Sequence, residues 1–317
     1  MKIIVPEFVL DEIQAAACEL VQACEFVTVG SQGVLCGEIA GAEVLMLPFE
    51  MPPALLDAIL ALPTLRWVHT VSAGVDHALG SLQQRPDVLF TNARGVFDAP
   101  IAETVLAYIL MIAKRMPELL AQQREQRWKL LPLREVAGLS VGLIGLGGIG
   151  GEIARRCQAL GMRVVATRRR PELPAPYVDV LLPTERLAEL LGRVDFVVVA
   201  VPLTPETTGM IGATELAHIR PEAWFINIAR GAVVDEAALI DALTAGRISG
   251  AALDVFAEEP LPPESPLWTL PNVILTPHNS WSTPRVNERE AQLFMDNLER
   301  YLRGEALRNV VDRTLGY

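Results

Sequence analysis

The chain has 317 residues, a formal net charge of −11 and a hydrophobic fraction of 51%. Its length favours two domains, each large enough to bury a core, and its hydrophobic fraction excludes extended disorder. The negative charge argues against nucleic acid or an anionic membrane as a partner, because both require a basic face.

Cysteine use and the start of the chain favour the cytoplasm. The four cysteines are scattered and lack a CxxC pair, which is typical of reduced thiols and not of a disulfide framework. The apolar run within residues 1–12 is too short for a signal peptide, and the apolar windows 104–113 and 196–203 are too short to cross a bilayer. We expect a cytoplasmic protein with no membrane partner and no metal site.

The first hundred residues predict a small α/β unit. A strand at residues 2–6 precedes an alanine-rich helix at 13–24, and further strands fit 44–47 and 67–70. Pro52 can begin the helix between the last two strands. This segment has no glycine fingerprint of its own, so we assign it a role in binding substrate.

The strand at 67–70 leads into a loop of small residues, Ser72, Ala73, Gly74 and Val75. Such a loop exposes successive backbone N–H groups, which can bind a carboxylate. A plain glycine turn is the alternative interpretation.

A domain boundary is predicted at residues 98–100, because a proline at the first helical turn begins a new helix there. This helix is predicted to run from Ile101 to about Arg127. A helix of that length could bridge domains or form a dimer face.

The next segment, 139–170, predicts a nucleotide-binding unit. A strand at 141–144, a turn at 145–150, a helix at 152–160 and a strand at 163–167 follow one another. Glycine-rich turns also join ordinary strands and helices, so a purely structural turn is the alternative. The complete order of strand, turn, helix and strand favours dinucleotide binding.

Each glycine of this GxGxxG turn has a physical role. Gly145 allows a sharp turn, Gly147 allows the backbone to approach a pyrophosphate, and Gly150 allows the helix to pack closely. The phosphates are expected at the positive end of the helix.

The end of the second strand of this unit predicts the cofactor. Many dinucleotide-binding units carry an acidic residue there that binds the ribose, whereas this chain has Thr167, Arg168, Arg169 and Arg170. A guanidinium can bind a 2′-phosphate that a carboxylate would repel, which favours NADP(H) over NAD(H). A solvated basic turn is the alternative.

The later apolar runs predict parallel strands buried on both faces. Runs at 224–228, 250–253 and 273–275 are followed by polar residues, namely Arg230, Asp254 and His278. Ligands of doubly wound sheets bind at the carboxyl ends of the strands, so these three side chains are candidates for one site. Glu259 lies five residues beyond Asp254 in a proline-rich loop.

Four motifs in this order resemble the D-isomer-specific 2-hydroxyacid dehydrogenases. They are GLIGLGGIG at 142–150, FINIARGAVVDEAALIDAL at 225–243, ALDVFAEEPLP at 252–262 and LTPHNSW at 275–281. The resemblance implies an α/β fold of two Rossmann-like or flavodoxin-like doubly wound parallel-sheet domains. The substrate domain would comprise 1–98 and 284–317, with the cofactor domain, 99–283, inserted into it.

The resemblance also implies a catalytic trio. His278 would be the acid/base, Glu259 its carboxylate partner, and Arg230 the residue that binds the substrate carboxylate and carbonyl. The chemistry agrees, because histidine titrates near neutral pH, a carboxylate favours and orients the imidazolium, and arginine matches a carboxylate.

Other site residues follow from the same resemblance. Asp254 would lie near the nicotinamide. The substrate set is Ser72, Ala73, Gly74, Val75, Arg230 and Trp281, where Trp281 replaces smaller residues common in the family. The cofactor set is Thr104, Gly145, Gly147, Gly148, Ile149, Gly150, Thr167, Arg168, Arg169, Val201, Pro202, Thr207, Ala229 and Asp254.

These inferences predict an NADPH-preferring reductase of small 2-keto acids of the glyoxylate or hydroxypyruvate type, with NAD(H) use possible. The resemblance implies a homodimer through the cofactor domains. Two alternatives are an NAD-dependent phosphoglycerate-type dehydrogenase, disfavoured because the chain ends without a further regulatory domain, and a cofactor-sensing interaction protein on the same fold.

Overall fold

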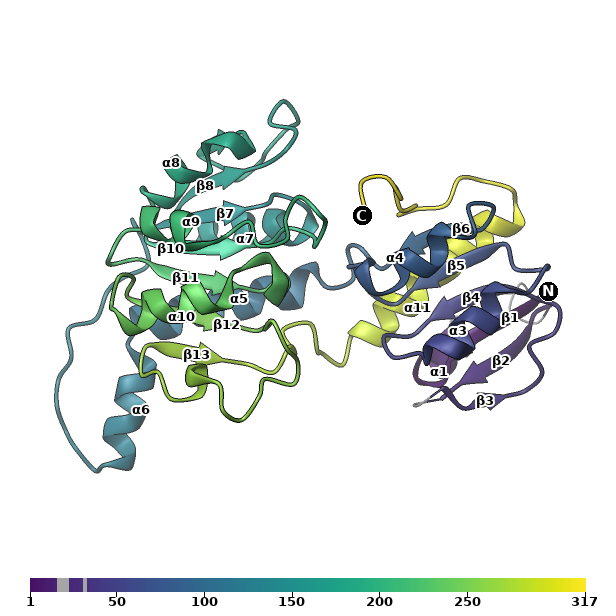
Figure 1. Cartoon of the computed structure of the whole chain (residues 1–317), viewed down its shortest axis with the longest axis horizontal. Helices are drawn as coiled ribbons and strands as arrows, with labels where there is room; N and C mark the ends of the chain where they lie inside the picture. The colour runs from purple at the N-terminus through teal and green to yellow at the C-terminus, as the bar shows by residue number, and fades with distance from the viewer. Residues whose placement is uncertain (16–22, 31–32) are drawn as a thin grey trace. The chain divides into compact units, whose positions relative to one another are not determined.

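The computed structural model describes residues 1–15, 23–30 and 33–317. Its contacts divide the chain into two compact units, which are drawn together in Figure 1. Unit 1 contains Met1–Phe97 and Ser282–Tyr317, and unit 2 contains Asp98–Trp281. Unit 2 is therefore inserted into unit 1 along the chain.

Unit 1 is built on a six-stranded sheet of order β3-β2-β1-β4-β5-β6. All neighbouring pairs are parallel except β2 with the short β3. The strands are β1 (Lys2–Pro6), β2 (Glu25–Val29), β3 (Leu35–Cys36), β4 (Ala42–Leu47), β5 (Trp67–Thr70) and β6 (Leu89–Asn92).

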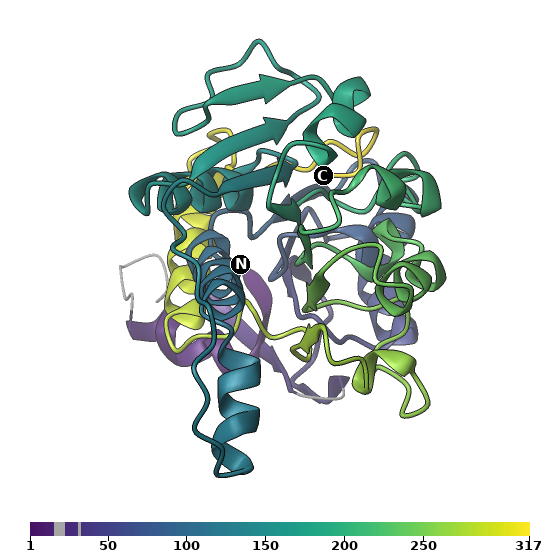
Figure 2. The same ribbon diagram turned by 90° about the vertical axis from the view of Figure 1, so that its left-hand side faces the viewer.

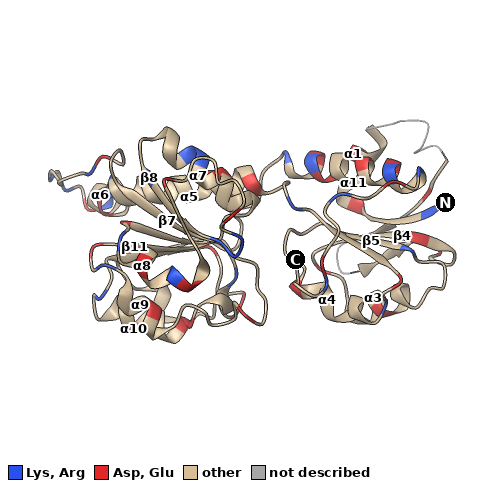
Figure 3. Ribbon diagram, turned by 90° about the horizontal axis from the view of Figure 1, so that it is seen from above, with Lys and Arg blue, Asp and Glu red and all other residues tan. Residues whose placement is uncertain are grey.

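Helices cover both faces of this sheet, because alternate strand residues point to opposite sides. Ile4 belongs to a core with α3 (Pro53–Leu60) and α4 (Asp76–Gln83). Ile3 belongs to a second core with α1 (Leu10–Ala15) and α11 (Val286–Leu302). Figure 3 shows the two helix layers above and below the strands of unit 1. The last helix, α11, therefore packs against the sheet formed by the first part of the chain.

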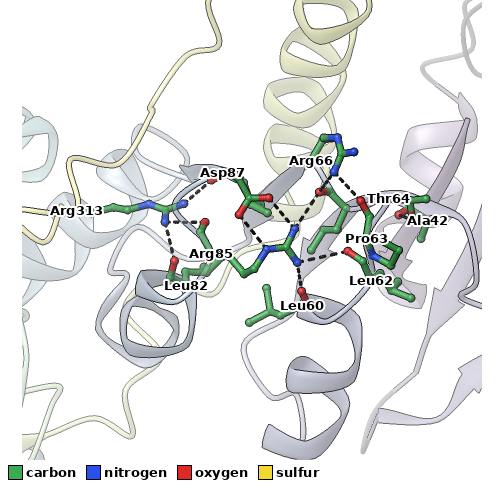
Figure 4. A network of polar contacts seen from close by, with 12 residues as sticks. Ala42, Leu60, Leu62, Pro63, Thr64, Arg66, Leu82, Arg85, Asp87 and Arg313 are labelled. Carbon is green, nitrogen blue, oxygen red and sulfur yellow. Dashed lines mark hydrogen bonds and ion pairs between the residues drawn. The ribbon is translucent and has the colours of Figure 1, made fainter.

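A polar network connects the C-terminal segment to the N-terminal part of unit 1 (Figure 4). Arg313 donates to the carbonyl oxygens of Leu82 at 2.6 Å and Arg85 at 2.9 Å. Arg85 itself binds both carboxylate oxygens of Asp87, at 3.0 and 2.8 Å. The hydrogen bond from Arg85 lowers the pKa of Asp87 to about 2.

Unit 2 is built on a seven-stranded sheet in which every neighbouring pair is parallel, of order β13-β12-β11-β10-β7-β8-β9. The strands are β7 (Ser140–Ile144), β8 (Arg163–Thr167), β9 (Val180–Leu182), β10 (Phe196–Val199), β11 (Trp224–Asn227), β12 (Gly250–Leu253) and β13 (Val273–Leu275).

Its helices also form two layers, visible in Figure 3. One contains α5 (Asp98–Ala113), which packs on α7 (Gly148–Ala159). The other contains α8 (Leu187–Leu191), α9 (Ala213–His218) and α10 (Glu236–Thr244), whose apolar residues share one core. The prediction of two doubly wound parallel-sheet domains is confirmed.

Two predicted helices differ from the structure. The single helix predicted over 101–127 is two helices, α5 and α6 (Met116–Arg124), because Arg115 adopts a left-handed φ of 50° and Pro117 begins the second. Figures 1 and 2 show α6 and the segment after it projecting away from the sheet of unit 2. The helix predicted over 13–24 falls mostly on residues 16–22, outside the described residues.

Among the described residues, the helices are all too short or too polar for a membrane span.

Candidate active site

The glycine-rich turn joins β7 to α7 at the point where the strand order reverses. Gly145 has a φ of +99°, which a residue with a Cβ rarely adopts, and a Cβ there would lie 2.5 Å from the carbonyl oxygen of Ala200. A Cβ on Gly150 would lie 2.4 Å from the carbonyl oxygen of Gly145. Close backbone packing therefore requires glycine at both positions.

Gly147 differs from these two glycines, because a Cβ built on it meets no atom of the described residues within 4 Å. It is the N-cap of α7, and among the described residues no side chain caps this helix end. The exposed N–H groups at the start of a helix are suited to binding phosphate. The turn therefore fits a dinucleotide: two glycines keep the loop tight, and the third leaves space beside the helix end.

The arginines that follow β8 line a loop of their own unit. Arg168 is half-buried as a residue, and its guanidinium donates to the carbonyl oxygens of Arg170 at 2.9 Å and Pro174 at 3.4 Å. The hydrogen bond to Thr204 lowers the pKa of Glu206, and the charge of Arg169 contributes to this lowering. The side chain of Thr167 is buried at the end of β8. Binding of a 2′-phosphate by Arg168 stays a prediction.

Three of the predicted site residues follow three adjacent strands. Arg230 follows β11, Asp254 follows β12 and His278 follows β13, and these strands pair in parallel as neighbours. Neighbouring strands lie about 4.8 Å apart, so the outer two loops begin roughly 10 Å from each other. Unit 2 therefore brings these three residues to one edge of its sheet.

His278 and Glu259 form a close pair. The imidazole Nδ1 lies 2.6 Å from the Glu259 carboxylate oxygen Oε2, and the other oxygen, Oε1, accepts the N–H of Phe256 at 2.9 Å. About a third of each side chain is exposed. With Nδ1 held by the carboxylate, the second ring nitrogen, Nε2, is left to exchange a proton with a substrate oxygen.

Arg230 is carried by a loop that a buried amide shapes. The Asn227 side chain accepts the N–H of Ala229 and donates to the carbonyl oxygen of Arg230, both at 3.1 Å. A Cβ on Gly231 would lie 1.8 Å from the carbonyl oxygen of Phe256, so this loop packs directly against the loop of Glu259. Asn227 was missed at the sequence level, although an amide within an apolar strand was a usable signal.

Asp254 is fully buried and holds the loop that carries His278. Its Oδ1 accepts the Thr276 hydroxyl at 2.5 Å and the N–H of Asn279 at 3.1 Å, and its Oδ2 accepts the N–H of Ser280 at 3.1 Å. The carboxylate thus binds the chain on both sides of His278. Its predicted position near a nicotinamide is untested.

The predicted substrate loop lies in unit 1, at the end of β5. Ser72 and Val75 are buried, while Ala73 and Gly74 are partly exposed. The side chain of Asn92 donates to the carbonyl oxygen of Ala73 at 2.9 Å, and the N–H of Ala93 donates to that of Ser72 at 3.0 Å. Neighbouring residues therefore fix the shape of this loop.

The remaining predicted residues have structural contacts within unit 2. Thr104 donates to the carbonyl oxygens of Pro100 and, at 3.4 Å, of Ser280. Thr207 donates to the carbonyl oxygen of Pro202 at 2.6 Å, and so closes the loop after Val201. The Trp281 indole donates to the carbonyl oxygen of His278 at 2.9 Å. Ala229 is buried, whereas Gly148 and Ile149 are at the accessible start of α7.

Sequence comparison shows the family of this chain. The model of the D-isomer specific 2-hydroxyacid dehydrogenase family, NAD binding domain, matches residues 106–280. The glyoxylate reductase of Korarchaeum cryptofilum is 37% identical over 265 residues, which cover 80% of this chain and 78% of that protein. The D-3-phosphoglycerate dehydrogenase of Methanocaldococcus jannaschii is 34% identical over 81% of this chain, and the chain spans about half its length, 49%.

Two crystal structures resemble the whole chain. A D-isomer specific 2-hydroxyacid dehydrogenase from Xanthobacter autotrophicus, in complex with NADPH and MES, has a TM-score of 0.87 and 33% identity, with 99% of each chain covered. An NADPH-dependent glyoxylate/hydroxypyruvate reductase from Sinorhizobium meliloti, in complex with NADP and sulfate, has a TM-score of 0.87 and 29% identity, with 100% of this chain and 99% of that chain covered.

Proposed function

Because this chain belongs to the D-isomer-specific 2-hydroxyacid dehydrogenase family, we propose that it reduces small 2-keto acids to D-2-hydroxy acids with a preference for NADPH. The observation that carries the proposal is the 2.6 Å pair of His278 and Glu259, on the same sheet edge as Arg230. Glyoxylate and hydroxypyruvate are the proposed substrate type, since relatives carry those names.

Each residue of the predicted catalytic trio has a separate role in this proposal. Arg230 binds the substrate carboxylate and polarises the keto oxygen, because a guanidinium is permanently charged and has a planar pair of donors. A nicotinamide cofactor held by unit 2 would supply the hydride that adds to the keto carbon. His278, as imidazolium, donates its Nε2 proton to the keto oxygen, and Glu259 stabilises the positive ring before that transfer. The product is a neutral hydroxyl on the former keto carbon.

The domains keep their predicted roles in this proposal. Unit 2 would hold the cofactor through Gly147 and the start of α7, and unit 1 would bind substrate through the loop at 72–75. Support for NADPH over NADH comes from Arg168 in place of an acid and from the NADP(H) bound to two similar structures.

The first experiment follows NADPH absorbance at 340 nm with glyoxylate and hydroxypyruvate. Wild-type protein should consume NADPH, and His278→Gln should lose about 10²- to 10⁴-fold in kcat, the usual size of an acid/base contribution. His218→Gln, an exposed histidine on α9, is the matched control and should be unchanged. Wild-type turnover by His278→Gln would contradict the proposed acid/base role of His278.

The second experiment tests the cofactor preference. Arg168→Asp should weaken NADPH far more than NADH, because it replaces a phosphate-binding cation with a repelling carboxylate. Arg170→Gln removes an exposed charge from the same turn and should alter both affinities slightly and equally. Equal weakening of both cofactors by Arg168→Asp would contradict the preference.

The two alternative functions are decided by the same assays. Faster turnover of D-3-phosphoglycerate with NAD than of the plain acids would favour the phosphoglycerate-type reaction, which the half-length match permits. Tight NADPH binding without turnover of any keto acid would favour a cofactor-sensing protein.

We also propose a homodimer through unit 2. The projecting segment of α6 and residues 125–135 exposes large apolar side chains, with Trp128 98% and Leu130 88% exposed. Such exposure is costly in water and is typical of a protein interface. Sedimentation velocity should give a dimer that Trp128→Asp with Leu130→Asp converts to monomer. A monomeric wild type would contradict the proposal.

A further inference from the structure

A chain of hydrogen bonds runs from the helix α5 to the loop that carries His278. The hydroxyl of Tyr108 contacts that of Thr276, and Thr276 Oγ1 lies 2.5 Å from Asp254 Oδ1. An ionised carboxylate only accepts, so the Thr276 proton points to Asp254 and the Tyr108 hydroxyl must donate to Thr276. Each hydrogen bond in this series therefore has a defined donor, from Tyr108 to Thr276 and from Thr276 to Asp254.

The loop at the end of this chain has an unusual backbone. His278 has a φ of +48°, in the left-handed region that residues other than glycine seldom adopt. Its own N–H donates to the carbonyl oxygen of Asp254 at 2.8 Å, and the bonds from Thr276 and Ser280 to the Asp254 carboxylate lie on either side. A strained residue persists only where its surroundings determine it, so these bonds set the direction of the imidazole.

We propose that Tyr108 and Thr276 are positioning residues for His278, which keep its imidazole on Glu259 by fixing the Asp254 carboxylate under the loop. The proposal rests on the proposed function, because it assumes that His278 is the acid/base. Neither residue touches substrate or cofactor in this role; both act through the loop.

The environment of Tyr108 suits a permanent donor. The residue is buried, at 2% exposed, and burial raises the pKa of its hydroxyl to about 12, with the nearby Asp254 charge acting in the same direction. The tyrosine therefore keeps its proton at every pH at which such an enzyme works. Phenylalanine at this position would fill the same space and leave Thr276 without its donor.

The kinetic test compares Thr276→Val, Thr276→Ser and Tyr108→Phe. Valine has the shape of threonine without the hydroxyl, so kcat should fall roughly tenfold or more, as small misplacements of a catalytic group commonly do, while KM for NADPH stays within about twofold. Serine keeps the hydroxyl and should restore kcat. Tyr108→Phe should show the same pattern with a smaller loss.

The pH dependence distinguishes positioning from a general loss of stability. A loosened contact with Glu259 stabilises the imidazolium less, so keto acid reduction by Thr276→Val should decline at a lower pH than in the wild type. The matched control is Ser140→Ala, which removes a hydroxyl that donates to the Asp195 carboxylate at 2.7 Å at the opposite end of the same sheet. It should lower the melting temperature and leave the pH profile unchanged.

A spectroscopic test works even without turnover. The chain has four histidines, so the ring signals of histidine-labelled protein can be assigned by one His278→Gln spectrum. The His278 ring signal should shift in Thr276→Val, because its contact with Glu259 is loosened, and return in Thr276→Ser. If it stays fixed in every variant, the positioning role is wrong; if it moves but no keto acid is reduced by the wild type, the proposed function fails instead.

Discussion

The two units share a topology but differ in the loop that follows their central strand. β1 lies between β2 and β4, and β7 lies between β8 and β10, so both sheets reverse their strand order at the corresponding place. β1 ends at Pro6 and the exposed Glu7 follows it directly, whereas β7 is followed by the turn from Gly145 to Gly150. An exposed carboxylate repels a phosphate, and a bare helix end attracts one. The same fold therefore provides a nucleotide site only where the loop chemistry permits it.

The units also differ in the hydrogen bonding of a buried carboxylate. In unit 2 the side chain of the buried Asp254 accepts three hydrogen bonds that shape the loop of His278. In unit 1 the buried Glu290 lies 3.7 Å from His69, and neither carboxylate oxygen has a hydrogen bond among the described residues. The first carboxylate organises a loop, whereas burial raises the pKa of the second.

Gly150→Ala should have the largest effect on stability and NADPH binding, because it disrupts the turn from Gly145 to Gly150 in unit 2. Its Cβ would collide with the Gly145 carbonyl oxygen at 2.4 Å, so stability should fall by about 1–3 kcal/mol and NADPH binding should be lost. Gly151→Ala is the matched control on the same helix, since its Cβ meets no described atom within 4 Å. Urea denaturation measures the stability of the two variants, and fluorescence titration measures their NADPH binding. Equal behaviour of the two variants would contradict the packing argument.

Gly147→Ala should distinguish the contribution of this glycine to cofactor binding from its contribution to stability. Its Cβ has open space among the described residues, so stability should change by less than about 0.5 kcal/mol. If the pyrophosphate approaches this glycine, NADPH affinity should fall by about tenfold or more, equivalent to about 1.4 kcal/mol. Unchanged affinity, measured by isothermal titration calorimetry, would place the pyrophosphate elsewhere.

Glu290→Gln should affect unit 1 alone. Burial raises the pKa of Glu290, and a carboxyl with a raised folded pKa adds stability below its unfolded value and loses it as pH rises. At pH 7 the amide should therefore stabilise the fold by about 1–2 kcal/mol, a gain that shrinks below about pH 4. Exposed Glu288→Gln on the same helix is the control for denaturant melts. Destabilisation at pH 7 would indicate a true ion pair with His69.

Asp87→Asn should have the smallest effect. The hydrogen bond from Arg85 lowers the pKa of Asp87 to about 2, so this carboxylate adds stability above its ordinary pKa and loses it as pH falls toward 2. The variant should therefore show a slightly shallower acid decline in melting temperature. Asp57→Asn, on the exposed face of α3, should follow the wild-type curve. Identical acid curves for Asp87→Asn and wild type would show that solvent screens the pair completely.

The sequence by itself determined the fold class and the family, and it predicted the pair of His278 and Glu259 that the structure brings into contact. Apolar runs buried on both faces predict parallel strands wherever they occur, and the residue after each run must lie at the carboxyl edge of the sheet. Glycine at 145 and 150 was informative for the same reason, because close packing permits no other residue there. Local patterns of this kind depend on backbone geometry, which is encoded near each residue.

Only the tertiary structure decided which residues support that pair. The contacts of Tyr108 with Thr276 and of Asn227 with Arg230 depend on where a helix and a loop meet the sheet edge, and spacing along the chain carries no such information. The break at Arg115 and the burial of His69 against Glu290 were likewise invisible, because each is selected by packing partners far away in sequence. Tertiary contact, and not local propensity, sets the environment of a polar side chain.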